Sequence, residues 1–476
     1  MAGSAGRLRA GVAGAVITPD RPLPIEGYAH PNGPAVGTRD PLEARAIVFD
    51  DGERRAAVVS VDLISLWPTT VRRIRAAVEE RCGIAPDSAL LAFSHTHSGP
   101  AATRYTGVPV DDDYLRWLET TVVAAVAEAA GTLRPATLGA GEGSCGFNMN
   151  RRRRALGGFA GGRLNPLGAV DRRVRVLRVD PAAYGPAAPG TLGGHALPQA
   201  DPIALLFGYV CHPTVLGPDN YRYSADYPGA ARRFVEAAYR AENAGPAAGP
   251  ASPLGGATDR AGTLALFLPG CFGNVRPALL APEGRWRPGT DHELTVLGRW
   301  LGSEVVKVAE RSPGRPVDSI AAGRREVRLA YARVADEAEI RAALDTPRRY
   351  WAEFLLERIA GEGALPAFET SEVQVMRLGR HWLVATPGET VLEIGQSIER
   401  GFIELGLADP SQGDQVITIG YANDYVAYLC SASVMVEGGY EAVSWYEYLR
   451  SGPFMPEIEA TLVDAALGLG LELARA

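Results

Sequence analysis

Two histidines separated by a single residue are the part of this chain best suited to chemistry. Residues 94–100 read Ser-His-Thr-His-Ser-Gly-Pro and follow an apolar run at 89–93, so we predict a buried strand that ends at this segment. Residues i and i+2 of an extended chain face the same side. The imidazoles of His95 and His97 are therefore expected to reach one point, as metal binding or proton transfer requires. The chain holds only 7 histidines among 476 residues, which makes this pairing unusual. The alternative is a pair of polar residues that only cap the strand.

A third histidine and a glutamate lie at similar strand ends. His212 follows the apolar run 203–211 and precedes a Pro-Thr pair, so it is either a second metal-directed imidazole or an ordinary strand-end histidine. Glu389 follows a predicted strand at 382–385 and a Pro-Gly turn, and it precedes a predicted helix at 391–398. It is either a carboxylate that a tight turn delivers to a strand end or a helix N-terminal charge, and taken alone the second is the more common case.

Tyrosines and arginines supply the remaining candidates. Tyr428 and Tyr440 lie in the segments 423–428 and 438–441. Tyrosine is a rare metal ligand and a common oxyanion donor, although spacing alone favours aromatic packing here. The run Arg151–Arg154 cannot all face one pocket, so we expect most of it to be solvated, with one fixed arginine suited to an oxyanion or a carboxylate. A local phosphate or membrane-surface patch is the alternative.

The elements that position these residues alternate irregularly between strand and helix. This alternation predicts an α/β fold with mixed β-sheets flanked by helices and with the candidate metal site at strand ends. The individual predictions are a strand at 10–17, a hairpin of strands 44–49 and 56–61 around Asp50-Asp51-Gly52, a helix from Pro68 to near Gly83, a second helix after Asp111–Asp113, and a charged helix or helix pair at 336–359.

We expect one domain over residues 1–476. Two Pro/Gly-rich segments without periodicity, 181–202 and 243–262, are predicted to be insertions that interrupt the fold without dividing it, because the strand between them is strongly apolar.

Composition narrows the class of protein. The net charge is −7, from 48 basic and 55 acidic residues, which argues against nucleic acid as a partner. No apolar stretch approaches the roughly 20 residues of a membrane span. The 5 cysteines are scattered without a C-x-x-C pair, which argues against a disulfide framework and a cysteine zinc knuckle. Because residues 10–17 are better described as a first strand than as a signal peptide, we expect a cytoplasmic protein.

The motifs, taken in order, resemble those of the neutral/alkaline non-lysosomal ceramidases. The resemblance spans about residues 10–450 and covers the catalytic region only. It is carried by Gly27-Tyr28-Ala29, Ala44-Arg45-Ala46, Val61-Asp62, the Ser94–Pro100 segment, Asn150-Arg151, His212-Pro213-Thr214, Ser224–Gly229, Gly270–Pro277, Pro387-Gly388-Glu389 and the stretch from Tyr428 to Tyr440.

This resemblance implies a zinc-dependent amidase. In it, one zinc is held by residues that correspond to His95, His212, Glu389 and Tyr428. The residues that correspond to His97, Arg151 and Tyr440 line the reaction centre. We therefore expect hydrolysis of a small-molecule N-acyl amide through a metal-activated water. Zinc lowers the pKa of bound water toward about 7. His97 would carry a proton to the departing nitrogen, while Arg151 and Tyr440 would hold the developing oxyanion.

The chain departs from the family pattern at two places. The usual Gly-Asp-Val-Ser-Pro-Asn is here Gly-Asn-Val-Arg-Pro-Ala at 273–278, and the residues after Asn150-Arg151 are arginines. The extra arginines Arg152, Arg153 and Arg276 are expected to suit a carboxylate or phosphate on a soluble substrate rather than ceramide.

Two other classes of function remain open from the residues alone. One is a zinc hydrolase of another bond, an ester or a phosphoester. The metallo-β-lactamase pattern H-x-H-x-D-H is not met, because Ser98-Gly99-Pro100 lacks the aspartate. The other is a non-catalytic ligand-binding protein on a hydrolase scaffold.

Overall fold

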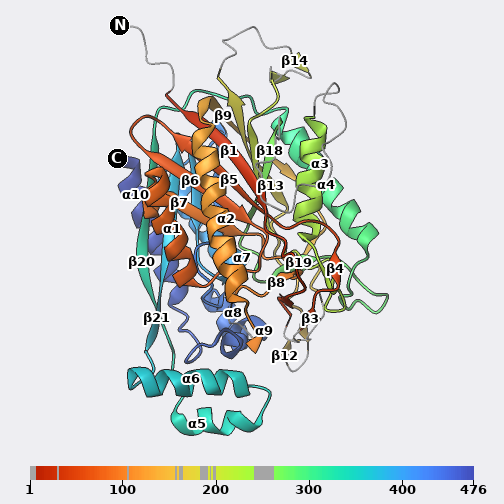
Figure 1. The fold of residues 1–476 in the computed structure, drawn as a ribbon, viewed down its shortest axis with the longest axis vertical. Helices are drawn as coiled ribbons and strands as arrows, with labels where there is room; N and C mark the ends of the chain where they lie inside the picture. Colours follow the sequence, from red (N-terminus) through yellow and green to blue (C-terminus); the bar gives the residue numbers. More distant parts are fainter. Residues whose placement is uncertain are drawn as a thin grey trace.

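An eight-stranded mixed sheet forms the centre of the molecule (Figure 1). The computed structural model describes residues 7–28, 32–103, 107–155, 158–159, 164–182, 191–192, 195–196, 200–240 and 262–475. The strand order is β18-β16-β13-β9-β1-β5-β6-β7, and neighbours are antiparallel except for the parallel pairs β6/β7 and β16/β18. The strands are β1 (Arg9–Val16), β5 (Glu43–Asp50), β6 (Arg55–Val61), β7 (Ala89–Phe93), β9 (Arg134–Ser144), β13 (Arg173–Pro181), β16 (Ala204–Tyr209) and β18 (Leu264–Pro269).

A four-stranded sheet packs against one face of the large sheet. Its order is β20-β21-β22-β24, with β22 and β24 parallel. The apolar core between the two sheets contains residues from all twelve strands, including Ile47 and Phe49 of β5 and Ile417 of β24. The strands are β20 (Ile320–Ala330), β21 (Phe368–Leu378), β22 (His381–Ala385) and β24 (Val416–Ile419).

Helices cover the outer face of each sheet, which makes four layers in all. Alternate residues of a strand point to opposite faces, so on β5 Ala46 and Val48 pack with α1 and α2 while their neighbours face the second sheet. Helices α3 and α4 cover the β13-β16-β18 side, and α7 and α10 cover the small sheet. The helices are α1 (Pro68–Cys82), α2 (Asp112–Gly131), α3 (Asp226–Ala238), α4 (Asp291–Ala309), α7 (Leu392–Glu404) and α10 (Ile458–Arg475).

Shorter helices and strands lie outside the two sheets and the helices that cover them. Helices α5 and α6 lie at the far end of the long β20–β21 pair, and α8 and α9 lie between that end and the small sheet (Figure 1). The short helices are α5 (Glu337–Ala342), α6 (Arg349–Glu362), α8 (Ala432–Glu437), α9 (Tyr440–Val443), η1 (Pro86–Ser88), η3 (Ala343–Asp345), η4 (Pro410–Gln412) and η5 (Ser444–Tyr448). The short strands are β2 (Pro24–Glu26), β3 (Asn32–Pro34), β4 (Gly37–Thr38), β8 (Gly99–Pro100), β10 (Asn148–Asn150), β11 (Arg154–Ala155), β12 (Gly158–Phe159), β14 (Thr191–Leu192), β15 (His195–Ala196), β17 (Arg222–Tyr223), β19 (Val275–Pro277), β23 (Glu389–Thr390) and β25 (Tyr428–Leu429).

The predicted fold class, mixed β-sheets flanked by helices, is confirmed. The charged segment 336–359 is a helix pair, α5 and α6. Of the two predicted insertions, 243–262 lies outside the described residues except for its last position. In 181–202 the structure describes little more than the two-residue strands β14 and β15.

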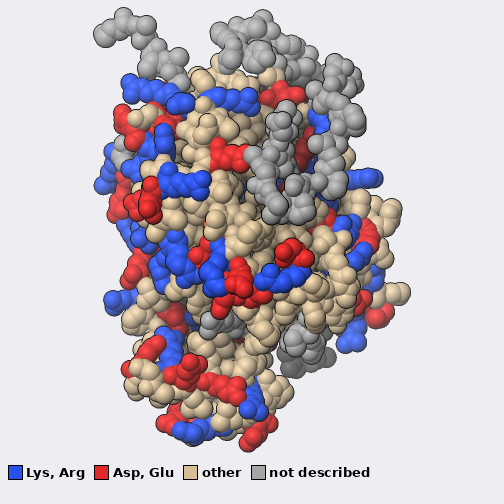
Figure 2. Space-filling model, in the orientation of Figure 1, with Lys and Arg blue, Asp and Glu red and all other residues tan. Residues whose placement is uncertain are grey.

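The surface charges, the cysteines and the helices show no special feature. Basic and acidic side chains are interspersed over the face that carries α1 and α2 (Figure 2). All five cysteines are buried and free. Within the described part of the chain, no helix has both the length and the apolar character needed to cross a membrane.

Candidate active site

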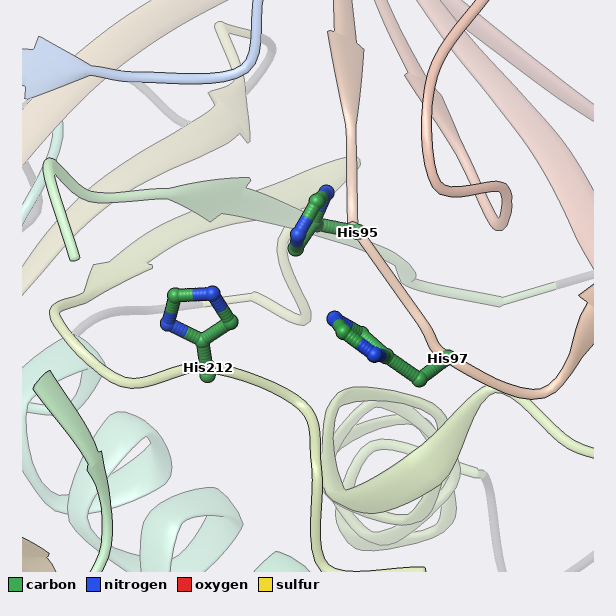
Figure 3. A group of neighbouring side chains, drawn as sticks. All are labelled: His95, His97 and His212. Carbon is green, nitrogen blue, oxygen red and sulfur yellow. The ribbon is translucent and has the colours of Figure 1, made fainter. Parts of the chain in front are cut away.

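Three histidines from two strand ends meet at one point (Figure 3). His95 and His97 follow β7, His212 follows β16, and one ring nitrogen from each lies within 4.8 Å of the others. The rings of His95 and His97 are 5.0 Å apart between centroids, and those of His95 and His212 are 5.2 Å apart. His95 and His212 are buried, and His97 is half-buried. The two imidazoles of the His-Thr-His segment therefore converge as expected, and His212 joins them.

The backbone brings His95 and His97 together through a turn. We expected an extended chain with both side chains on one strand face, and that geometry is wrong. Strand β7 ends at Phe93, and His95 has a φ of 64°, in the left-handed region that non-glycine residues seldom adopt. The N–H of His95 donates to the carbonyl oxygen of Leu63 at 2.9 Å, so the chain after β6 holds the turn. Backbone strain of this kind is concentrated at functional sites.

Backbone carbonyls fix the tautomers of two of the rings. Nδ1 of His95 lies 2.9 Å from the carbonyl oxygen of Ile64, and Nδ1 of His212 lies 2.8 Å and 2.9 Å from those of Phe272 and Val275. Because a carbonyl oxygen only accepts, each Nδ1 carries the proton and donates it. Each Nε2 then presents a lone pair. Metal-binding histidines are usually held in this way.

Glu389 reaches the histidines by the tight turn that the sequence predicts. Gly388 has a φ of 63°, and a Cβ at this position would lie 2.5 Å from the carbonyl oxygen of Ala427. Only glycine fits such a turn without strain. Strand β23 begins at Glu389, and the buried carboxylate points to the cluster rather than serving as a free charge at the start of α7.

The carboxylate faces the two histidine lone pairs. Oε2 of Glu389 lies 3.1 Å from Nε2 of His212 and 3.4 Å from Nε2 of His95. Burial lowers the pKa of His212 to about 4, so its ring is neutral near pH 7. A carboxylate oxygen and imidazole lone pairs are all acceptors, and they repel one another in a buried site unless a proton or a cation lies between them. Among the described residues, nothing donates a hydrogen bond to Nε2 of His95.

Three tyrosines hold Glu389 in place. The hydroxyls of Tyr425 and Tyr448 donate to Oε1, the first at 3.1 Å, and Tyr421 donates to Oε2 at 3.4 Å. No sequence motif predicts this role for any of them. Tyr425 lies inside the candidate segment 423–428, whereas no local pattern marks Tyr448, which lies in η5.

Tyr428, Arg151 and Tyr440 form a second group beside the cluster. Strands β23 and β25 are parallel, with Tyr428 opposite Glu389. Nη2 of Arg151 donates to the Tyr428 hydroxyl oxygen at 2.7 Å, and the ring of Tyr440 lies 5.6 Å from that of Tyr428. Tyr440 is 47% exposed and its hydroxyl donates to Glu447. Burial raises the pKa of Tyr428 well above its usual value, so its hydroxyl stays protonated unless a cation binds it.

The arginine run differs from the expectation. Arg153 is exposed, Arg151 is half-buried and Arg152 is buried. Nε of Arg151 donates to Oε1 of Glu441 at 2.8 Å, and Nη1 of Arg152 donates to Oε2 of the same carboxylate at 2.5 Å. The expectation that most of the run is solvated is wrong for Arg152, because a residue distant in sequence supplies its counter-charge. The side chain of Arg154 lies outside the described residues.

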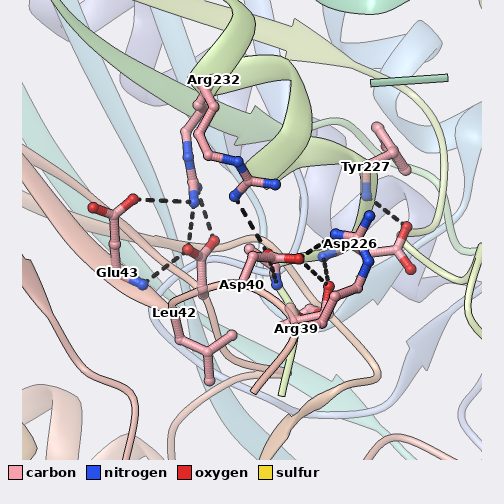
Figure 4. A network of polar contacts seen from close by, with 12 residues as sticks. Arg39, Asp40, Leu42, Glu43, Asp226, Tyr227 and Arg232 are labelled. Atoms are coloured by element: carbon pink, nitrogen blue, oxygen red, sulfur yellow. Dashed lines mark hydrogen bonds and ion pairs between the residues drawn. The ribbon is translucent and has the colours of Figure 1, made fainter. Parts of the chain in front are cut away.

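A buried polar network beneath α3 supports the loop that carries His212 (Figure 4). Asp226, the first residue of α3, accepts hydrogen bonds from the backbone N–H groups of Val215 and Leu216 at 3.3 Å and 3.0 Å. Further along the helix, Nη1 of Arg232 donates to Oδ1 of Asp62 at 2.8 Å. Oδ2 of Asp62 also accepts a hydrogen bond from the backbone N–H of Glu43 in β5 at 2.9 Å, so α3 links the His212 loop to β5 and to the end of β6.

The same network supports the other histidine loop. The hydroxyl of Thr96, between the two histidines, donates to the carbonyl oxygen of Ser224 at 2.6 Å. The Ser224 hydroxyl in turn donates to Asp40 at 2.9 Å. The Ser224–Gly229 motif is therefore a support for the histidines rather than a source of reacting groups.

His97 is enclosed but has no polar partner among the described residues. Neither ring nitrogen is hydrogen-bonded. Gly27 packs against it so closely that a Cβ would lie 2.7 Å from Cγ of His97, and the ring of Tyr28 lies 4.8 Å from its ring. Burial lowers the pKa of His97 well below its usual value, so its ring is neutral near pH 7. His97 is thus neutral, and its ring nitrogens are not engaged by any described residue.

These donors fit a divalent transition metal. Two oriented imidazole lone pairs and a carboxylate oxygen converge, and Tyr428 lies opposite the glutamate on the paired strand. Imidazole nitrogens and carboxylate oxygens are ligands that zinc takes in proteins, and a cation removes the repulsion among the acceptors.

Comparison with solved structures shows that the chain has the fold of the neutral ceramidases. It matches a neutral ceramidase from Pseudomonas aeruginosa with a probability of 1.00, a TM-score of 0.68 and 18% identity, covering 98% of this chain and 75% of that chain. It matches a ceramidase complexed with C2 with the same TM-score and 17% identity, covering 98% of this chain and 76% of that one. The chain matches no protein-family model and no curated protein. The fold that the motifs implied is confirmed.

Proposed function

We propose that this protein is a zinc-dependent amidohydrolase that cleaves an N-acyl amide. The observation that carries the proposal is the meeting of Nε2 of His95, Nε2 of His212 and Oε2 of Glu389 in a buried site. The fold shared with structures named as ceramidases supports the amide as the bond that is cleaved.

In the proposal, zinc is held by His95, His212, Glu389 and Tyr428. The first three already converge, and Tyr428 lies opposite Glu389 on the paired strand. When bound, zinc acts as a Lewis acid that polarises a carbonyl and lowers the pKa of water toward about 7. Tyr421, Tyr425 and Tyr448 keep the Glu389 carboxylate directed at the histidines.

His97 is the proposed proton carrier. It is neutral, it adjoins both other histidines, and its ring nitrogens have no competing partner among the described residues. It can accept a proton from water and pass it to the departing nitrogen, which must be protonated to leave as an amine.

Arg151 is the proposed oxyanion donor. Glu441 fixes its Nε, and its Nη2 meets the Tyr428 hydroxyl, so the guanidinium is oriented before substrate arrives. A fixed cation at this position stabilises negative charge on the carbonyl oxygen as the amide is attacked. Tyr440 packs beside it and would supply a second donor at the more exposed end once its hydroxyl turns from Glu447 to the substrate.

Hydrolysis assays test the proposal directly. The purified protein is incubated with short N-acyl amino acids, with ceramide in detergent, and with ester and phosphoester analogues, before and after chelator treatment. We expect amide cleavage that the chelator abolishes and added zinc restores. Good ester or phosphoester cleavage with no activity on any amide would overturn the amidase assignment. Failure on every bond, with ligand binding retained, would identify a binding protein.

A further inference from the structure

We propose that Arg276 binds an anionic group of the substrate, a carboxylate or a phosphate, beside the histidine cluster. The inference rests on the proposed function and narrows its substrate class. Of the three extra arginines at the site, Arg152 is already paired with Glu441 and Arg153 is exposed. Arg276 is the one that combines partial burial with proximity to the cluster.

Strand β19 places Arg276 next to a residue that orients a histidine. The carbonyl oxygen of Val275 accepts the Nδ1 proton of His212, and Arg276 follows immediately. β19 also pairs with β10, which leads directly into Arg151. Arg276 is thus tied through the backbone to two residues of the proposed reaction centre.

Tyr28 connects Arg276 with the histidine cluster. The charges of Tyr28 and Arg276 act on each other, so the two side chains lie near one another. The ring of Tyr28 in turn lies 4.8 Å from that of His97. We therefore infer that the guanidinium can reach one end of a substrate bound at the cluster.

Arg276 is held rigidly but lacks an acceptor. Its guanidinium carbon lies 3.6 Å from the centre of the Trp286 ring, which fixes the plane of the group. Nε of Arg276 and Nε1 of Trp286 are both buried and have no hydrogen-bond partner among the described residues. No carboxylate of a described residue forms an ion pair with Arg276, and burial lowers the pKa of its guanidinium to about 10. A half-buried cation whose Nε has no hydrogen-bond partner is costly to a protein, and an anionic ligand would relieve that cost.

The geometry of the group favours a planar or tetrahedral oxyanion. Arginine presents parallel N–H groups that match two oxygens of a carboxylate or a phosphate. An amide whose acyl or amine part carries such a group would meet Arg276 at one end and the zinc ligands at the scissile bond. Ceramide carries no such anion.

A set of three matched amides tests the inference. N-octanoylglycine carries a carboxylate, N-octanoylphosphoethanolamine carries a phosphate, and N-octanoylethanolamine is neutral. We expect the wild-type enzyme to prefer one of the two anionic compounds over the neutral one. The preferred compound shows whether the site binds a carboxylate or a phosphate. Arg276→Met should lower kcat/KM for that compound by about 10- to 100-fold, mainly through KM, and leave the neutral one nearly unchanged. Arg276→Lys should show a smaller loss, because it keeps the charge without the fork.

Arg299→Met is the matched control, since it removes an exposed arginine of α4 that has no part in the site and should leave all three rates unchanged. Thermal unfolding of each variant checks the fold, and Arg276→Lys carries the test if the methionine variant does not fold. Equal losses on the neutral and anionic amides, or no preference in the wild-type enzyme, would overturn the inference while leaving amide hydrolysis intact.

Calorimetric titration separates this inference from the proposed function. Two zinc-loaded proteins are compared, the His97→Ala variant and the His97→Ala/Arg276→Met double variant, because His97→Ala suppresses turnover. N-octanoylglycine and N-octanoylphosphoethanolamine are titrated into each. Binding that depends on Arg276 without any amide cleavage by the parent enzyme would retain the anion site and reject the amidase. Equal binding to both proteins would reject the anion site.

Discussion

Nε2 of His212 lies 3.1 Å from Oε2 of Glu389, although the two residues are 177 positions apart in the sequence. Both atoms are acceptors when the histidine is neutral and its Nδ1 proton is held by backbone carbonyls. Two acceptors this close together need a cation or a proton between them, which is why we place a metal ion here. Substitution of either residue should therefore weaken metal binding.

We expect His212→Ala and Glu389→Gln to lose bound zinc. The wild-type protein should carry one zinc per chain after zinc-supplemented purification, since a four-donor site holds a single ion. Each variant removes a donor, so its metal content should fall well below that of the wild type when measured by elemental analysis. His292→Ala, an exposed histidine of α4, is the control and should keep its metal. A wild-type protein without zinc would contradict the assignment.

His97→Ala should keep zinc and lose turnover. His97 is assigned proton transfer rather than metal binding, and loss of a general acid–base group costs roughly 10²- to 10⁴-fold in rate. Zinc content and kcat are measured on the same preparation. Because His97 lies in one cluster with His95 and His212, loss of metal in this variant would show that it is a ligand.

Gly27→Ala should lower both stability and turnover. The φ of Gly27 is 127°, and a Cβ would lie 2.7 Å from Cγ and 2.8 Å from Cα of His97. Overpacking of this kind costs about 1–3 kcal/mol, and relief requires His97 to move. Denaturant unfolding and kcat report the two effects. Gly52→Ala is the control, because its φ is 91° and a Cβ there meets nothing within 4 Å. If both substitutions change kcat equally, the contact between Gly27 and His97 is not what affects turnover.

Glu26→Gln should remove a pH dependence of stability. Burial raises the pKa of Glu26 from 4.5 to about 7. Between these values the folded protein holds a proton that the unfolded chain releases, so this group's contribution to stability falls as pH rises through that window. The neutral variant avoids this loss. Its free energy of unfolding relative to the wild type should therefore rise by up to about 3 kcal/mol as the pH rises from about 5 to about 8. Urea unfolding at the two pH values measures it. A constant difference between the proteins would show that Glu26 titrates normally.

Local patterns in the sequence determined most of the frame. The Asp50-Asp51-Gly52 turn joins β5 and β6, and α1 begins at Pro68 and ends before Gly83, which adopts a left-handed conformation. These signals act over a few residues, because turn geometry and helix caps depend on the chain nearby. The resemblance of the motifs to those of the ceramidases named seven site residues, and the structure brings these residues together.

Tertiary structure decided what those residues contact. The left-handed backbone at His95, the Tyr448 hydroxyl on Glu389 and the shared pairing of Arg151 and Arg152 with Glu441 all depend on partners far away in the chain. Burial and long-range pairing set the charge state and orientation of each group, and no local pattern encodes them. For this reason the sequence by itself determined which residue types meet, and only the packed layers decided that Arg152 is occupied while Arg276 has no acceptor among the described residues.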